Sequence, residues 1–251
     1  MDLFEHADKE SRKEAEPLAE RMRPRYLDEF IGQQDLIAKG SLLRNAIDED
    51  RLFSMIFWGP PGSGKTTLAR IISRETRSHF ETFSAVLSGI KEVRHVIERA
   101  KEVRQHYQKR TVLFVDELHR FNKAQQDAFL PHVESGLLTL IGATTENPSF
   151  EIIAPLLSRV RIMVLEPFSH EDLTKILTRA LEDKQNGLGK LGITVEPKAL
   201  DYMVWTADGD ARAALNNLEA AASLVIKEAE SQRTITPKLV EKALQKKALR
   251  Y

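Results

Sequence analysis

The eight residues GPPGSGKT, Gly59–Thr66, have the residue types and the spacing of a phosphate-binding loop. They fit the pattern G-x-x-x-x-G-K-S/T and lie between an apolar run and an amphipathic stretch, as a loop between a strand and a helix would. Glycines let the backbone turn its N–H groups toward phosphates, and the helix N-terminus adds positive partial charge there. The pattern assigns Lys65 to the β- and γ-phosphates and the Thr66 hydroxyl to Mg²⁺, with an ordinary Gly-Pro turn as the alternative. The predicted nucleotide-binding residues of this segment are Gly59, Pro60, Pro61, Gly62, Ser63, Gly64, Lys65, Thr66 and Thr67.

A second apolar run, VLFVDE, ends in the two carboxylates Asp116 and Glu117. Open α/β sheets bind their ligands at the carboxyl ends of the strands, so both acids are expected near the phosphate loop. We predict that Asp116 holds Mg²⁺ together with Thr66, and that Glu117 accepts a proton from the attacking water. Alone, the run also fits a strand that ends in a solvated turn. Its pairing with the phosphate loop favours the functional interpretation.

The elements that must position these residues follow an alternating pattern. Short apolar runs typical of buried strands alternate with longer stretches whose apolar residues recur every three to four positions, as in helices. The predicted strands span residues 54–58, 79–84, 111–116, 137–143 and 161–165. Alternation of this kind predicts an α/β fold, a parallel sheet covered by helices on both faces.

The pattern changes near Glu166, after which every periodic stretch is helical. Ser169 and Asp172 have the spacing of a capping box, and Pro197 and Pro237 fit first helical positions. We therefore predict three parts: an N-terminal tail (1–16), an α/β nucleotide-binding domain (17–166) and a small all-helical lid domain (167–251).

Composition limits the classes of protein. The 251 residues carry 37 basic and 37 acidic side chains, which argues against a simple basic protein that coats nucleic acid. Cysteine is absent, so disulfides and cysteine metal sites are excluded. No apolar run approaches the roughly 18 residues of a membrane span, and we expect a cytoplasmic protein that does not bind membranes. Basic residues accumulate in 90–110 and 236–251, which fits either a DNA-contacting face or ordinary solvated helices.

Four further stretches, together with the two motifs above, resemble an AAA+ ATPase. They are RMRPRYLDEFIGQ (21–33), GATTEN (142–147), LLSR (156–159) and GDARAALN (209–216). In their order and residue content, these motifs resemble most closely the replication-associated recombination protein A family. That family includes bacterial maintenance-of-genome-stability ATPases and eukaryotic Werner-helicase-interacting ATPases. Clamp-loader subunits are a more distant resemblance.

The resemblance implies roles for residues that the two motifs leave unassigned. It implies adenine contacts from the first stretch, a first sensor in GATTEN, an arginine finger in LLSR and a second sensor on a lid helix. The adenine contacts are Arg23, Pro24, Ile31 and Gly32. The first sensor is Thr145, the arginine finger is Arg159 and the second sensor is Arg212. For Arg212, helix-start capping chemistry is the alternative.

Arg159 has no acidic residue for several positions on either side. The resemblance implies that it serves the γ-phosphate bound by an adjacent subunit. Alternatively, it pairs with a carboxylate brought close by folding, or solvates its loop.

As a whole, the resemblance implies an ATPase, with ATP and Mg²⁺ bound, that acts on DNA or protein–DNA complexes at stalled replication forks. The alternative is a nucleotide-dependent scaffold, or a clamp-loader-like module, whose ATP state controls partner binding. Expected partners are single-stranded DNA ends or forks, single-strand-binding protein, and a sliding clamp, for which Leu3-Phe4 is a short candidate motif. The family continues into a helical oligomerisation domain, so we expect a homo-oligomer from a longer form, a monomer from this core, and nucleoid association in a bacterial cytoplasm.

Overall fold

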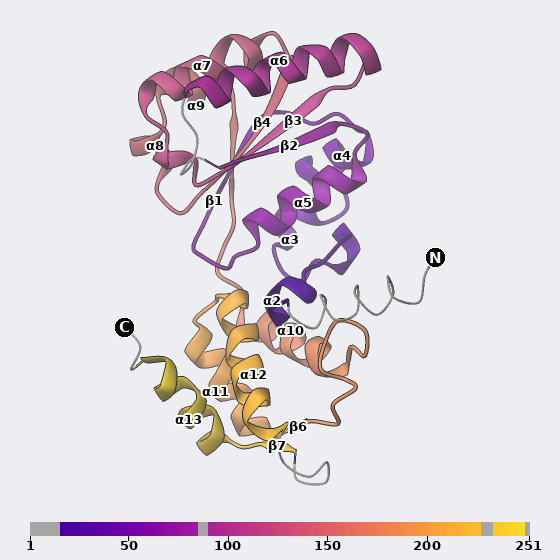
Figure 1. Cartoon of the computed structure of the whole chain (residues 1–251), viewed down its shortest axis with the longest axis vertical. Helices are drawn as coiled ribbons and strands as arrows, with labels where there is room; N and C mark the ends of the chain where they lie inside the picture. The colour runs from indigo at the N-terminus through magenta and orange to yellow at the C-terminus, as the bar shows by residue number, and fades with distance from the viewer. Residues whose placement is uncertain (1–15, 85–89, 227–232, 249–251) are drawn as a thin grey trace. The chain divides into compact units, whose positions relative to one another are not determined.

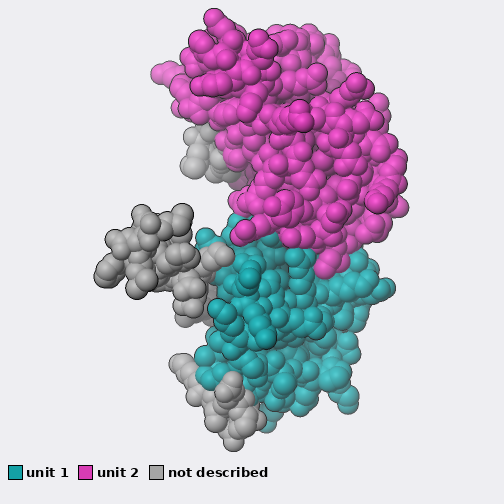
Figure 2. All heavy atoms as spheres, turned by 90° about the vertical axis from the view of Figure 1, so that its right-hand side faces the viewer, with its two compact units in different colours: residues 1–23, 167–251 teal, residues 24–166 magenta. Residues whose placement is uncertain are grey.

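The computed structural model describes residues 16–84, 90–226 and 233–248. The chain divides into two compact units, which Figure 2 distinguishes by colour. The α/β unit comprises residues 24–166, and the helical unit comprises residues 1–23 and 167–251. Within the described ranges, none of the helices has the length and apolarity that crossing a bilayer requires.

The α/β unit contains a five-stranded sheet in the order β2-β3-β4-β1-β5, with every pair of neighbours parallel. Each apolar run that predicted a strand forms one, so the predicted parallel sheet is confirmed. The strands are β1 (Met55–Trp58), β2 (His79–Ser84), β3 (Thr111–Asp116), β4 (Leu138–Thr144) and β5 (Arg161–Val164).

Helices cover both faces of this sheet, as predicted (Figure 1). On one face, Leu113 and Val115 of β3 pack in a buried cluster with Val93 of α6 and Phe129 of α7. Phe114 points to the opposite face, where it stacks on Phe80 at a centroid distance of 6.2 Å. The helices of this unit, with the 3-10 turns η1 and η2, are η1 (Leu27–Glu29), α3 (Gln34–Ile37), α4 (Leu42–Asp48), α5 (Lys65–Glu75), α6 (Ile90–Tyr107), η2 (Leu118–Arg120), α7 (Lys123–Glu134), α8 (Pro148–Glu151) and α9 (Ala154–Leu157).

Helix α7 begins and ends at residues that favour helix termini. The Asn122 side chain accepts from Gln125 N and the Gln125 side chain accepts from Asn122 N, a reciprocal capping box. Gly136, one residue past the C-cap Ser135, adopts φ 66°, a conformation that glycine reaches without steric cost. Both ends of α7 are therefore defined, which sets the position of its last residue, Glu134.

The helical unit differs from its predicted form in two respects. It contains a two-stranded parallel sheet, β6-β7, so the prediction of an all-helical domain was wrong in that detail. Residues 17–23, expected with the α/β domain, also belong to it, because Leu18 is fully buried there and its N–H donates to Glu219 Oε1 at 2.9 Å. Its elements are α2 (Leu18–Arg21), α10 (His170–Glu182), β6 (Thr194–Val195), α11 (Pro197–Ala207), α12 (Ala211–Val225), β7 (Thr234–Ile235) and α13 (Pro237–Ala248).

Candidate active site

The loop between β1 and α5 has the backbone of a phosphate cradle. Gly62 (φ 69°) and Gly64 (φ 99°) take left-handed conformations that side chains disfavour, and α5 begins directly after them at Lys65. Ser63 is fully buried, and its hydroxyl has no hydrogen-bond partner within the described part of the chain. Buried polar atoms are normally satisfied, so an orphaned hydroxyl inside this loop fits a segment built to surround a polar ligand.

Lys65 is held inside the same loop. Its side chain is 8% exposed, and Nζ donates to the carbonyl oxygens of Gly59 and Pro60 at 2.7 Å each. These contacts fix the ammonium group beside the N-terminus of α5, where two sources of positive charge coincide. The loop therefore offers an anion a preorganised cation.

We expect Lys65→Ala to lower the affinity for ATP by at least about 100-fold, because loss of a largely buried charge leaves the phosphates without their cation. Titration with a fluorescent ATP analogue measures the effect, and thermal unfolding checks that the variant is folded. Lys39→Ala is the matched control, since Lys39 is an exposed lysine of the same unit. Unchanged affinity in Lys65→Ala would remove this lysine from phosphate binding.

Thr66 and Asp116 meet at the start of α5 and the end of β3. Thr66 Oγ1 donates to Asp116 Oδ2 at 3.4 Å, and Asp116 Oδ1 accepts from Glu117 N at 3.2 Å. A hydroxyl and a carboxylate oxygen at one point suit Mg²⁺, which uses few protein ligands and completes its shell with water and phosphate oxygens. The donor set predicted from the sequence is therefore assembled.

Glu117 follows in a strained backbone conformation. Its φ of 55° is left-handed, which costs energy in a residue with a side chain and recurs at functional sites. The turn gives the two neighbouring carboxylates different partners. Asp116 contacts Thr66, whereas Glu117 Oε2 lies 3.3 Å from His119 Nε2.

His119 connects Glu117 to the end of β4. Its Nδ1 lies 2.9 Å from Oγ1 of Thr144, the last residue of β4, and Thr144 O accepts from Gly59 N at 3.3 Å. The ends of three strands are thus joined through one imidazole and one threonine. The sequence motifs assigned no role to His119 or to Thr144. The sensor prediction fell on the next residue, Thr145, which is half-buried beyond the strand.

The segment predicted to border the adenine reaches the phosphate loop through a residue that was not predicted. Gln33 Nε2 donates to Glu166 O at 2.7 Å and lies 3.4 Å from Ser63 O, while Glu166 N donates to Gln33 Oε1 at 3.1 Å. Gly32, buried with φ 76°, and the half-buried Ile31 directly precede it. Gln33 therefore holds this segment against both the loop and the last residue of the α/β unit.

Arg23 and Pro24 lie on opposite sides of the division between the two units. Within the helical unit, Arg23 donates from Nε and Nη2 to Glu20 Oε2, at 3.1 and 2.5 Å. Pro24 opens the α/β unit and is half-buried. Their predicted contact with adenine stays a prediction.

Arg159 lies at the far end of the sheet from the phosphate loop. Two residues after it, Arg161 pairs in register with Met55 at the amino end of β1, whereas the loop starts at Gly59, beyond the carboxyl end. At about 3.3 Å per residue, the four residues from Met55 to Gly59 alone span about 13 Å. An arginine side chain reaches only about 7 Å, from bonds of about 1.5 Å. Arg159 is therefore out of reach of the loop of its own subunit.

Folding gives Arg159 a carboxylate partner that its neighbours in sequence do not supply. Its Nε forms an ion pair with Glu134, and Nη1 donates to Pro155 O at 2.6 Å and to Ser158 Oγ at 2.8 Å. The pairing raised as an alternative thus exists. Because both side chains of the ion pair are well exposed, at 38% and 47%, the arginine remains accessible to a further ligand.

Arg212 is an exposed residue at the start of α12 in the helical unit. The capping group of this helix is Asp210, whose Oδ1 accepts from Ala213 N at 2.8 Å. Capping therefore does not require Arg212. Gly209, just before the cap, accepts a hydrogen bond from Phe168 N at 3.1 Å, so this helix start is fixed to the residues that follow Glu166.

Two family models match the chain. Residues 22–152 match the model described as the Holliday junction DNA helicase RuvB P-loop domain, and residues 189–251 match the AAA C-terminal domain. Among solved structures, the Holliday junction branch migration motor RuvB of Thermotoga maritima is 30% identical, with a TM-score of 0.71 over 90% of this chain and 72% of that one.

Curated relatives are similar over nearly the whole chain. Replication-associated recombination protein A of Escherichia coli K12 is 49% identical over 94% of this chain and 53% of its own length. The protein of that name in Coxiella burnetii is 50% identical over 91% and 51%, respectively. ATPase WRNIP1 of Dictyostelium discoideum is 40% identical over 92% and 26%. The chain spans about half the length of the bacterial relatives named here.

Proposed function

Since the chain belongs to the AAA+ family of the RuvB-type P-loop domain, we propose that it hydrolyses ATP to ADP and phosphate with Mg²⁺. The observation that supports this most directly is the meeting of Lys65, the Thr66–Asp116 pair and Glu117 at the carboxyl ends of β1 and β3. Phosphoryl transfer depends mainly on positioning and charge stabilisation. These residues supply a cation, a metal-binding pair and a base.

Each side chain has a distinct task in this proposal. Lys65 binds the β- and γ-phosphates, and Thr66 with Asp116 would hold Mg²⁺, which when bound neutralises charge that develops on the phosphates. Glu117 accepts the proton of the attacking water. His119 holds the Glu117 carboxylate from the side of β4, which limits the directions that this base can take.

We expect His119→Ala to lower kcat about tenfold, because a base that has lost its supporting contact spends less time in productive geometry. The affinity for ATP should not change, since the phosphate loop is intact. Steady-state phosphate release and nucleotide titration separate the two effects. His170→Ala, at an exposed position in the helical unit, is the control. A changed affinity with unchanged kcat would contradict the role proposed for His119.

The biological setting that we propose is the remodelling of DNA or protein–DNA complexes at stalled replication forks. The names of the curated relatives reported above support it. We propose DNA ends or forks as partners of an assembled homo-oligomer, with single-strand-binding protein and a sliding clamp as further partners, in a bacterial cytoplasm at the nucleoid. The candidate clamp motif Leu3-Phe4 lies outside the described residues.

The test is the ATPase rate against single-stranded DNA, closed duplex circles, linear duplexes with free ends and forked DNA. Stimulation by ends or forks over closed duplex circles is expected for a remodelling enzyme. The scaffold function would instead be favoured if none of these DNAs changed the ATPase rate and if partner binding depended on ATP but not on turnover.

We expect Arg212→Ala to remove the preference for ATP over ADP, because Arg212 in this proposal senses the γ-phosphate. Contact with that phosphate would pull on the start of α12. Through the hydrogen bond between Phe168 and Gly209, it would also pull on the residues just past Glu166. Competitive titration with ADP and a non-hydrolysable ATP analogue measures the preference. Lys198→Ala, an exposed cation in the same unit, serves as the control. An unchanged ATP preference in Arg212→Ala would exclude a sensor role.

A further inference from the structure

The Arg159 guanidinium is anchored on one side only. Nε contacts Glu134, and Nη1 donates to Pro155 O and Ser158 Oγ. A guanidinium carries one N–H on Nε and two on each terminal nitrogen. Within the described residues, the two N–H groups of Nη2 have no acceptor. Three contacts therefore fix the plane of the group and leave one edge available to an anion from outside the subunit.

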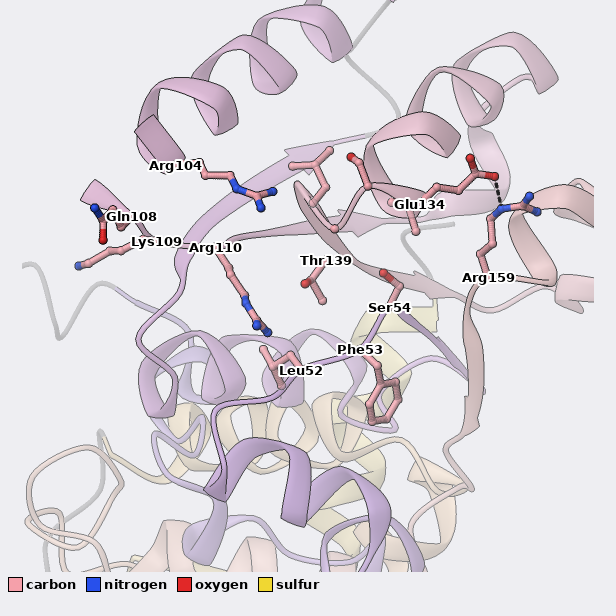
Figure 3. A pocket seen from close by; sticks show the side chains of 14 residues that line it. Leu52, Phe53, Ser54, Arg104, Gln108, Lys109, Arg110, Glu134, Thr139 and Arg159 are labelled. Carbon is pink, nitrogen blue, oxygen red and sulfur yellow. Dashed lines mark ion pairs between the residues drawn. The ribbon is translucent and has the colours of Figure 1, made fainter. Parts of the chain in front are cut away.

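The surroundings make the Glu134 carboxylate important for this arrangement. Arg159 and Glu134 line a pocket of about 650 Å³ at the amino end of the sheet, together with Arg104, Lys109 and Arg110 (Figure 3). Among the described residues that line it, Glu134 is the one acid. Without that carboxylate, the charged side chains among these lining residues would all be cationic. The long side chain of Arg159 would also regain rotamers that the ion pair excludes.

Helix stability does not account for an acid at this position. Glu134 is the last residue of α7, where the helix dipole disfavours negative charge. A carboxylate that opposes the dipole suggests a role other than helix formation. Its ion pair with Arg159 supplies one.

The two partners also stand on a common rigid support. The buried Gln126 side chain of α7 donates to Glu151 O at 3.0 Å and accepts from Ile153 N at 2.9 Å. This joins α7 to the segment that leads into α9 and Arg159. The distance between the backbones of Glu134 and Arg159 is therefore set by packing, so a carboxylate there can define where the guanidinium sits.

We propose that Glu134 is a positioning residue, which holds Arg159 ready for the γ-phosphate bound by an adjacent subunit. The inference rests on the function proposed for the site. The ion pair is exposed and therefore weak, so it orients the guanidinium without withholding it from a doubly charged phosphate.

The test uses the 251-residue chain at protein concentrations where turnover per site has stopped rising. We expect Glu134→Ala to lower kcat about fivefold, the rate equivalent of a well-formed exposed ion pair. KM for ATP should not change, because the phosphate loop is untouched. Glu134→Gln is nearly isosteric and keeps an acceptor oxygen, so we expect a smaller loss. Asp127→Ala, at an exposed acid of the same helix, should behave as the unmodified protein.

A double-mutant cycle distinguishes positioning from a structural effect. In the Arg159→Ala background, Glu134→Ala should cause no further loss, because the group it orients is gone. An equal fold-loss in both backgrounds would overturn the proposal, and so would a rise in kcat for Glu134→Ala, which would mean that the ion pair restrains the arginine. Full turnover in Arg159→Ala alone would instead refute the finger itself, and the role of Glu134 with it.

Discussion

We expect Glu117→Gln to abolish ATP turnover and to leave ATP affinity unchanged. The amide keeps the shape of the side chain but cannot accept the proton of the attacking water, and loss of a general base typically costs about 10²–10⁴ in rate. Affinity persists because Lys65 and the Thr66–Asp116 pair are not altered. Phosphate release under single-turnover conditions and equilibrium titration measure the two quantities.

The left-handed backbone at Glu117 sharpens this test. Glutamine tolerates the same φ of 55° no worse than glutamate, and its amide can still contact His119 Nε2. A fall in turnover in Glu117→Gln therefore reports the lost base and not a rebuilt turn. Glu102→Gln, at an exposed position on α6, controls for the loss of a negative charge. Turnover that survives in Glu117→Gln would assign the base to another group.

The parts of the site that could be predicted are those encoded within a short stretch of sequence. The loop Gly59–Thr66 and the run that ends at Asp116 each carry their own residue types, spacing and apolar flank, and the parallel sheet brings their ends together. The same holds for the strands and for the N-terminal cap of α10, which depend on periods and spacings of a few residues.

The contacts that could not be predicted join residues far apart in sequence. Glu134 and Arg159 are separated by 25 positions, as are His119 and Thr144, and Gln33 and Glu166 by 133. Each is set by strand register and helix packing, which no local period encodes. The helix α2 was assigned to the wrong unit for the same reason, since its place depends on the burial of Leu18 beside Glu219.

We expect Arg159→Ala to lower turnover by about 10³–10⁵, the range for an arginine finger supplied by a neighbour. The register of β5 on β1 keeps Arg159 away from its own phosphate loop, so this loss would reflect an incomplete site in the adjacent subunit. For the same reason, the specific activity of the unmodified chain should rise with protein concentration. A finger that acted on its own nucleotide would give a constant specific activity.

Mixing two inactive variants tests the direction of this contact. Arg159→Ala protein keeps a competent loop, and Lys65→Ala protein keeps the finger. In a random equal mixture of head-to-tail subunits, about a quarter of the interfaces combine the two intact parts, and turnover should recover in proportion. The control replaces the second partner by the Lys65→Ala/Arg159→Ala double variant, which supplies neither part and should restore nothing. Recovery of turnover is measured over the range of protein concentrations in which the specific activity of the unmodified chain rises. If both single variants are inactive and their mixture stays inactive across that range, Arg159 does not act between subunits.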